Sequence, residues 1–253
     1  MIRSFARGVL IGTACICLLA LGWLFLFRPS LAQYEASELK EAFTESDPGG
    51  NSGVLSLPWF NAENEKQLDL ASLQAQYPDV QAWLSIPGTR VDYPVLQSSM
   101  ENPEYYLRRN YKGEWRTAGS LFLQSDCRLS GKTLIVYAHN MNDGSMFADI
   151  AGYTQETYWR EHPIIQCDSL TRQREYEVMA VLQFKDSEQA AQDYYSVPRD
   201  EMNFTEYISR LADAALYDTG IQAVWGDQIL ALSTCSRQDS DSRILVIARK
   251  TGL

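Results

Sequence analysis

A cysteine near the C-terminus stands where a nucleophile would be displayed. The apolar stretch Gln228–Leu232 is followed by Ser-Thr and then by Cys235. A polar loop separates Cys235 from Arg243, and Arg243 directly precedes a second apolar stretch, Ile244–Ala248. An ordinary thiol is mostly protonated at neutral pH, and a nearby imidazolium or guanidinium stabilises the reactive thiolate. If the two stretches are antiparallel strands, the guanidinium lies beside the sulfur. Its planar fork of donors can then also stabilise an oxyanion or hold a carbonyl.

The chain contains two histidines, and one of them occupies the same kind of position as Cys235. His139 ends the apolar run Thr133–Ala138 and begins a turn. If both strands end on one rim of a sheet, thiol and imidazole meet, and His139 can act as general acid and base. His162 lies between an expected helix end and a strand, so we interpret it as a capping or hydrogen-bonding residue. By composition alone, a cysteine that is simply buried remains an alternative for Cys235.

The elements that would position these residues follow from the apolar pattern. Short runs rich in β-branched and aromatic residues predict strands of a barrel or sandwich. The runs are 91–97, 119–124, 132–138, 164–167, 176–184, 228–234 and 243–249. Helices are expected at 145–150 and at 200–217, where an apolar stripe indicates core packing. That stripe comprises Phe204, Tyr207, Ile208, Leu211 and Leu216.

The region before the strands is predicted to hold helices and a linker. We expect a short helix at about 34–43, a linker over the Gly-, Ser- and Asn-rich residues 44–64, and a helix or helix pair over 68–84 around Pro78. These predictions divide the chain into three parts. Residues 1–28 form a cytoplasmic tip and membrane anchor, 29–67 a helix and linker arm, and 68–253 the catalytic domain.

The N-terminal run Gly8–Phe27 contains 20 residues without a charge, enough for a single transmembrane helix. Arg3 and Arg7 precede it, which predicts a cytoplasmic N-terminus and an extracellular domain held at the cell membrane. A signal peptide cleaved near Ser30-Leu31-Ala32 is the alternative. The length of the apolar run favours an uncleaved anchor.

The net charge argues against one class of partner, and the cysteine content indicates a free thiol and no zinc site. The chain carries a net charge of −10, and three of its 22 basic residues but none of its 32 acidic ones precede residue 29. Such an acidic domain argues against nucleic acid as a partner, because phosphate binding needs a basic face. Beyond Cys15 and Cys17 of the apolar run, three cysteines remain (Cys127, Cys167 and Cys235), so at least one thiol is free unless it pairs between chains. Zinc-ligand spacing is absent from the sequence, and no metal site is predicted.

Two longer segments resemble a known family. The strings TLIVYAHNMNDGSMF and LSTCSRQDSDSRILVIAR closely resemble the signature segments of sortases, the cysteine transpeptidases that attach proteins to Gram-positive cell walls. The stretches VQAWLSIPGTRVDYPVLQ, NPEYYLRRNYKGEWRTAGSLFLQ and YWREHPIIQ are also similar to that family, so the resemblance covers about Leu68–Leu253. His-Asn-Met, Asn-Pro-Glu-Tyr-Tyr-Leu and a long insertion with a helix before the Cys strand resemble class B.

The resemblance implies a mainly β fold, an eight-stranded barrel with N-terminal helices and a helix in the long loop before the Cys strand. It implies that Cys235 is the nucleophile, His139 the general acid/base and Arg243 the substrate-positioning or oxyanion residue. No metal or organic cofactor is expected. Further candidate substrate-binding residues are Asn140, Ser233 and Thr234.

Two positions, Ala138 and Cys127, differ from the residues that are common in the family. Ala138 stands where sortases commonly have Gly before the His, and Ala is harmless there unless the backbone needs a positive φ. Cys127 is expected to be a spectator at the surface or half-buried.

The implied function is a membrane-anchored transpeptidase. It would cleave the sorting signal of surface proteins, LPXTG-like or NPXTN-like, after Thr and transfer them to an amine of a lipid-linked peptidoglycan precursor. A pilin-polymerising sortase is an alternative with a pilin lysine as acceptor. Two other classes remain: a non-catalytic membrane-tethered β-barrel binding module, and an L,D-transpeptidase, which the wide sequence separation of His139 and Cys235 disfavours.

Overall fold

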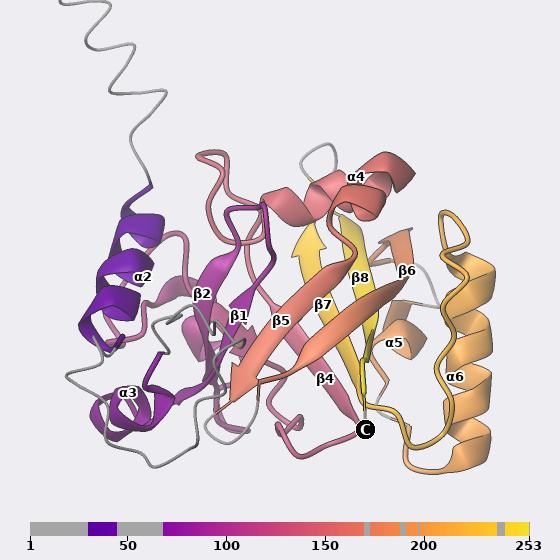
Figure 1. Ribbon diagram of the computed structural model, residues 1–253, viewed down its shortest axis with the longest axis horizontal. Coiled ribbons are helices and arrows are strands. Elements are labelled where there is room, and N and C mark those ends of the chain that lie inside the picture. Colours follow the sequence, from indigo (N-terminus) through magenta and orange to yellow (C-terminus); the bar gives the residue numbers. More distant parts are fainter. Residues whose placement is uncertain are drawn as a thin grey trace, which may run out of the picture.

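A closed β-barrel forms the centre of the molecule. The computed structural model describes residues 30–44, 68–169, 173–187, 191–196, 198–236 and 241–252. The strands follow each other around the barrel in the order β1-β2-β3-β4-β7-β8-β6-β5. Helices lie on the N-terminal side and in the long connection between β6 and β7 (Figure 1). The predicted eight-stranded, mainly β architecture is confirmed.

All seven runs predicted as strands form strands, β2 to β8. The strands are β1 Val80–Ser85, β2 Asp92–Gln97, β3 Leu121–Leu123, β4 Thr133–Tyr137, β5 Ile164–Ser169, β6 Glu175–Lys185, β7 Ile229–Cys235 and β8 Ser242–Lys250. Neighbouring strands are antiparallel except for two parallel pairs, β2 with β3 and β4 with β7. The parallel pairing of β4 with β7 matters most, because it brings two distant strand ends to the same rim.

The helix or helix pair expected over 68–84 is wrong in its second half. The helix α3, Leu70–Gln76, begins at the cap Asp69, whose carboxylate accepts from two backbone N–H groups. It ends at Tyr77, because the following Pro78 disfavours helical backbone at the residue before it. Strand β1 then begins at Val80. Its apolar spacing looked helical because both faces of β1 are buried, one in the barrel and one against α3 and its neighbours.

The other helices agree in part with the prediction. The helix α2, Leu31–Ala42, starts at a capping box between Ser30 and Gln33. In the long connection lie α5, Ala191–Tyr194, and α6, Glu201–Ala214, which buries three members of the predicted stripe: Phe204, Tyr207 and Leu211. Leu216 lies beyond the end of α6 and is exposed, so its assignment to the core stripe is wrong.

The helix predicted at 145–150 is wrong for residues 145–148, and helical backbone, of the 3₁₀ type, begins only at Asp149. Met146 adopts a positive φ of 55°, and the Asp143 carboxylate accepts from the Ser145 N–H, so this stretch is a turn. The 3₁₀ helix η2, Asp149–Thr154, and the helix α4, Glu156–Glu161, follow it. Another 3₁₀ helix, η1, Tyr105–Arg108, lies between β2 and β3.

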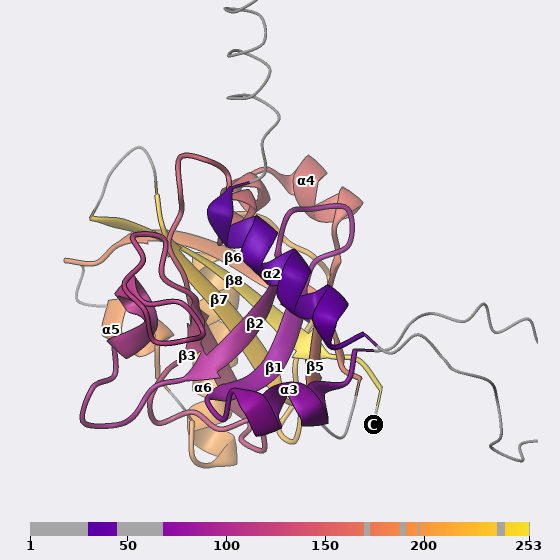
Figure 2. The ribbon, with the colours of Figure 1, turned by 90° about the vertical axis from the view of Figure 1, so that its left-hand side faces the viewer.

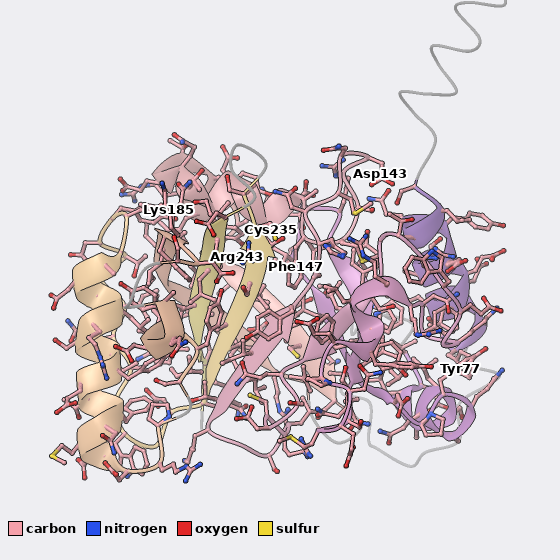
Figure 3. All side chains as sticks on the ribbon, turned by 180° about the vertical axis from the view of Figure 1, so that it is seen from behind. Tyr77, Asp143, Phe147, Lys185, Cys235 and Arg243 are labelled. Atoms are coloured by element: carbon pink, nitrogen blue, oxygen red, sulfur yellow. The ribbon has the colours of Figure 1, made fainter. Side chains whose placement is uncertain are left out.

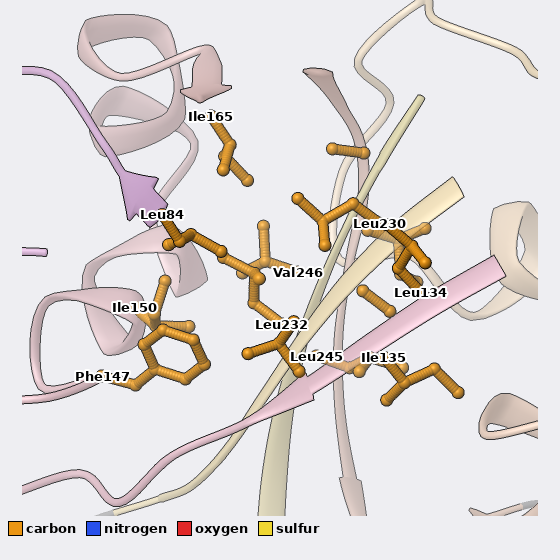
Figure 4. Close-up of a cluster of buried hydrophobic side chains, with 14 of the residues drawn as sticks. Leu84, Leu134, Ile135, Phe147, Ile150, Ile165, Leu230, Leu232, Leu245 and Val246 are labelled. Carbon is orange, nitrogen blue, oxygen red and sulfur yellow. The ribbon is translucent and has the colours of Figure 1, made fainter. Parts of the chain in front are cut away.

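The barrel interior is filled by aliphatic side chains from several strands. Leu84, Leu134, Leu230, Leu232 and Val246 are fully buried there (Figure 4). A second cluster covers the outside of β1 and β3 beneath α2, α3 and η1; its members are Leu39, Leu70, Leu73, Val80, Trp83, Leu96, Tyr106 and Phe122. Packing of this density holds the strand ends in place.

The helix α2 is attached to the barrel by charges as well as by packing. It lies across β2 (Figure 2). Lys40 pairs with Asp92 at 2.8 Å, and Glu35 pairs with Arg116 of the segment between η1 and β3. The helix predicted at about 34–43 is confirmed as α2, although it was assigned to the arm 29–67 and the structure packs it against the barrel.

The linker and the apolar N-terminal run fall outside the described residues. Of the predicted linker 44–64 only Thr44 is described, and it forms an isolated β-bridge with Leu68. Among the described residues, no helix is long and apolar enough to cross a membrane. The anchor over Gly8–Phe27 stays a prediction.

Candidate active site

The parallel strands β4 and β7 bring His139 and Cys235 to one rim of the barrel. Their register pairs Tyr137 with Ser233, and the Ala138 N–H continues the ladder by donating to the Ser233 carbonyl at 3.2 Å. The Thr234 hydroxyl donates to the Ala138 carbonyl at 2.8 Å. Cys235 is the last residue of β7, and His139 follows β4 by two positions. The expectation that both strands end on the same rim is confirmed.

Arg243 lies directly opposite Cys235 on the antiparallel strand β8. Its Nη1 donates to the Cys235 Sγ at 3.3 Å, and Figure 3 shows the two labelled side chains together. Its Nη2 donates to the Asp186 carboxylate at 2.6 Å. The guanidinium is thus held between sulfur and carboxylate, so a positive charge and directed donors stand at the thiol.

Asp186 is a residue of this site that was not predicted from the sequence. It follows directly after β6, whose Phe184 pairs with Arg243 across the sheet. An acidic residue next to the predicted strand 176–184 was a weak signal. Its significance depends on β6 and β8 being neighbours, which only the barrel topology shows.

His139 is half-buried and has a carbonyl partner. Its Nε2 lies 3.0 Å from the carbonyl oxygen of Leu107, and its own carbonyl accepts from the Phe147 N–H at 2.9 Å. Burial lowers the pKa of His139, and the positive charge of Arg108 lowers it further, while the hydrogen bond to Leu107 opposes them. The imidazole is therefore favoured in its neutral form, which can accept a proton.

The three candidate substrate-binding residues all lie around Cys235, engaged within the protein. Asn140 Nδ2 donates to the Cys235 carbonyl at 3.0 Å. Ser233 and Thr234 are buried, and the Ser233 hydroxyl shares a hydrogen bond with the Tyr195 hydroxyl at 2.9 Å. These contacts fix the end of β7. Their role in substrate binding stays a prediction.

The three described cysteines are all free thiols, but their surroundings differ. Cys127 and Cys167 are buried, and burial raises the pKa of Cys127 to about 11 and that of Cys167 to about 12. Cys235 is half-buried and carries the Arg243 contact. The expectation that Cys127 lies at the surface or half-buried is wrong, because its side chain is only 2% exposed and belongs to the larger hydrophobic cluster.

His162 and Ala138 have the structural roles that the sequence indicated. His162 is the C-cap residue of α4, and its Nδ1 lies 2.9 Å from the Pro87 carbonyl oxygen. This confirms its structural interpretation. Ala138 is buried and is not one of the described residues with positive φ, so the missing glycine leaves no backbone strain there.

Known proteins with a similar sequence and fold indicate the family of this chain. A sortase domain model matches residues 84–251. Sortase B of Listeria monocytogenes is 32% identical over 196 residues, which are 75% of this chain and 76% of the relative. A solved structure of sortase B from that species matches with a TM-score of 0.62 at 31% identity, covering 71% of this chain and 99% of the other. Sortase B from B. anthracis, in complex with AAEK1, matches with a TM-score of 0.69 at 25% identity, covering 86% and 95%.

The chain belongs to the sortase family. Its relatives place it in class B, so it is a sortase-type cysteine transpeptidase. Members of this family act on proteins that bear a sorting signal and transfer them to an amine acceptor.

Proposed function

We propose that this sortase cleaves a C-terminal sorting signal, LPXTG-like or NPXTN-like, after its Thr and transfers the protein to an amine of a lipid-linked peptidoglycan precursor. The observation that carries the proposal is the 3.3 Å contact between Arg243 Nη1 and Cys235 Sγ on a rim that also holds His139. Thiol, imidazole and guanidinium are the groups that acyl transfer through a thioester requires.

In the first half-reaction, the Cys235 sulfur attacks the Thr carbonyl carbon of the sorting signal. The thiol proton passes to neutral His139, which gives it to the leaving amine as the C–N bond breaks. A thioester between Cys235 and the Thr remains. Arg243 donates to the sulfur in the free enzyme, and its directed N–H groups stabilise the oxyanion or hold the substrate carbonyl.

In the second half-reaction, the acceptor amine attacks the thioester carbonyl. The amine loses a proton to His139 and an amide bond forms. As the C–S bond breaks, His139 gives that proton to the leaving sulfur, which restores the Cys235 thiol and the neutral imidazole. Proton transfer is balanced over the two steps, because His139 acts first as base and then as acid in each of them.

The proposed setting is the extracellular face of the cell membrane. The uncharged run Gly8–Phe27 supports a single-pass anchor with the N-terminus in the cytoplasm. Such an anchor would hold the enzyme where a membrane-bound substrate and a lipid-linked acceptor both reside, which raises their effective concentration.

The test is a peptide assay on the full-length chain. LPXTG-like and NPXTN-like peptides are incubated with the enzyme and with either a peptidoglycan-stem amine or a lysine-containing pilin peptide, and products are identified by mass spectrometry. We expect cleavage after Thr and transfer to the stem amine by the wild type and none by Cys235→Ala. Exclusive transfer to the pilin lysine would overturn the proposed acceptor, and cleavage by the folded Cys235→Ala variant would overturn the proposed nucleophile.

A further inference from the structure

The ring of His139 meets the backbone carbonyl of Leu107, the last residue of the Asn-Pro-Glu-Tyr-Tyr-Leu segment. The Leu107 carbonyl oxygen lies 3.0 Å from Nε2. A carbonyl oxygen only accepts hydrogen bonds, so this contact requires a proton on Nε2. In the neutral imidazole the lone pair then sits on Nδ1, and Nδ1 is the nitrogen able to take up a proton.

We propose that the Leu107 carbonyl is a positioning group that fixes His139 as the Nε2–H tautomer, so that Nδ1 performs the proton transfers of the reaction. The inference rests on the proposed role of His139 as general acid and base. It assigns a part in aligning the His139 ring to the segment 105–120, which comprises η1 and its connection to β3.

Hydrogen bonds fix the peptide groups on both sides of the Leu107 carbonyl. The Leu107 N–H donates to the Glu104 carbonyl at 2.9 Å, and the Tyr106 carbonyl accepts from the Ser120 N–H at 3.0 Å. One residue further on, the Arg108 carbonyl accepts from the Arg116 N–H at 2.9 Å. Because the peptides on either side are bonded, the Leu107 carbonyl has a fixed direction.

Gly119 allows the chain to close over that carbonyl. It has a φ of +61°, and a Cβ placed on it would contact the Leu107 oxygen and lie 2.7 Å from the Leu107 carbonyl carbon. Backbone at this distance cannot move aside as a flexible side-chain end could. Gly113 of the same segment also has a positive φ, +79°, but a Cβ there would meet only the Tyr105 hydroxyl at 3.1 Å. The two glycines therefore differ in their contact with Leu107.

The helix α2 supports the segment from outside. Glu35 of α2 pairs with Arg116, whose side chain is 12% exposed, and the Arg116 carbonyl accepts from the Gly119 N–H at 3.1 Å. The second ion pair of α2, between Lys40 and Asp92, leads to β2 instead. Loss of the Glu35 charge should therefore disturb His139, whereas loss of the Lys40 charge should not.

The two histidines of the chain make a direct test possible. His162 Nδ1 faces the Pro87 carbonyl oxygen at 2.9 Å, which requires the opposite tautomer, Nδ1–H. The full-length chain is labelled with ¹⁵N-histidine, and ring nitrogen shifts are recorded at a pH of about 8.5, above the usual imidazole pKa. Variants His139→Gln and His162→Gln assign the signals. We expect an Nε2–H ring for His139 and an Nδ1–H ring for His162. An Nδ1–H ring for His139 overturns the inference, whatever the enzyme's activity.

The variants connect the tautomer to catalysis. Both Gly119→Ala and Gly113→Ala introduce backbone strain, so both should lower the melting temperature. Only Gly119→Ala should reduce the Nε2–H population of His139 and lower kcat by about tenfold or more, with a smaller change in KM. Equal kinetic effects of the two substitutions would overturn the positioning role.

A milder pair covers the case in which Gly119→Ala does not fold. Glu35→Gln should shift the His139 ring signals and lower kcat, while Lys40→Gln should change neither. Unchanged His139 signals in Glu35→Gln would overturn the support by α2. Normal tautomers in a wild type that cleaves no sorting peptide would count against the proposed function and leave the hydrogen-bond assignment standing.

Discussion

Arg243 serves two partners with two different nitrogens. Nη1 reaches the Cys235 sulfur, and Nη2 reaches the Asp186 carboxylate. A lysine keeps the charge, but its single ammonium cannot reproduce this planar fork. The choice between a purely electrostatic role and a directed one is therefore open to experiment.

Arg243→Lys is expected to lower kcat/KM on one sorting peptide by about 10²-fold, the scale of removing one oxyanion donor. Arg243→Ala should lose at least as much. The measurement is kcat/KM for the three proteins under identical conditions, with the circular dichroism spectrum as a control for folding. Near-normal activity of the Lys variant would leave only an electrostatic role for Arg243.

Thiol reactivity should separate the three described cysteines. Cys127 and Cys167 are buried with raised pKa values, whereas Cys235 is half-buried beside a guanidinium. Iodoacetamide at neutral pH should therefore label Cys235 much faster. Labelled sites are located by peptide mass mapping, with Cys235→Ser as the control. Labelling of Cys127 at the same rate would contradict the buried position described for it.

The acid limb of the pH profile should depend on Arg108. Its charge helps to lower the pKa of His139, and the neutral ring needed as base is lost as the pH falls through that pKa. Arg108→Gln removes the charge, so the pKa of His139 should rise and the acid limb of kcat/KM should move to higher pH. Arg108→Lys retains the charge and should leave the limb nearly in place. A shift in the opposite direction for Arg108→Gln would show that the charge does not act on His139.

The turn after β4 returns toward His139 through a strained residue. Met146 has a φ of 55°, and its N–H donates to the buried Tyr93 hydroxyl of β2 at 3.2 Å. Asn140 and Met146 form an isolated bridge that closes the turn. Through Tyr93, β2 thus holds the loop that follows the proposed catalytic residue His139.

Tyr93→Phe should destabilise the protein by about 1–3 kcal/mol, because it leaves the Met146 N–H buried without its acceptor. The free energy of unfolding is measured by urea titration. Tyr34→Phe on α2 is the matched control. Tyr34 is 50% exposed, so loss of its hydroxyl should have little effect on the free energy of unfolding. Equal stability losses would argue against a structural role for the Tyr93 hydroxyl.

The closure of the barrel depends on a strand near the C-terminus of the sequence. Strand β7 lies between β4 and β8, and its Leu232 is fully buried in the barrel. Closure of the barrel therefore depends on the same strand that presents Cys235.

Leu232→Ala should lower the free energy of unfolding by about 2–5 kcal/mol, as expected when a buried leucine is replaced by a cavity. Leu31→Ala is the control, because Leu31 is 66% exposed. Urea unfolding measures both variants. A loss below that of the control would mean that the barrel collapses around the cavity or is packed differently.

Local pattern was sufficient for most of the elements and for the three proposed catalytic residues. Alternation and β-branched content are properties of a few consecutive residues, so the runs from 91 to 249 were predictable as strands. The motifs around His139 and Cys235 are equally local. Local pattern failed at β1, because burial of both strand faces removes the alternation that distinguishes a strand from a helix.

Only the tertiary structure decided what surrounds the catalytic groups. Asp186 meets Arg243 because β6 and β8 are neighbours, and the Leu107 carbonyl meets His139 because the segment 105–120 folds back over the rim. Neither contact has a sequence signature: one joins residues 57 positions apart, and the other uses a backbone atom that every residue possesses. The residue types thus determined which chemistry is possible, and the closure of the barrel decided which partners orient it, because long-range pairing places groups that no local pattern relates.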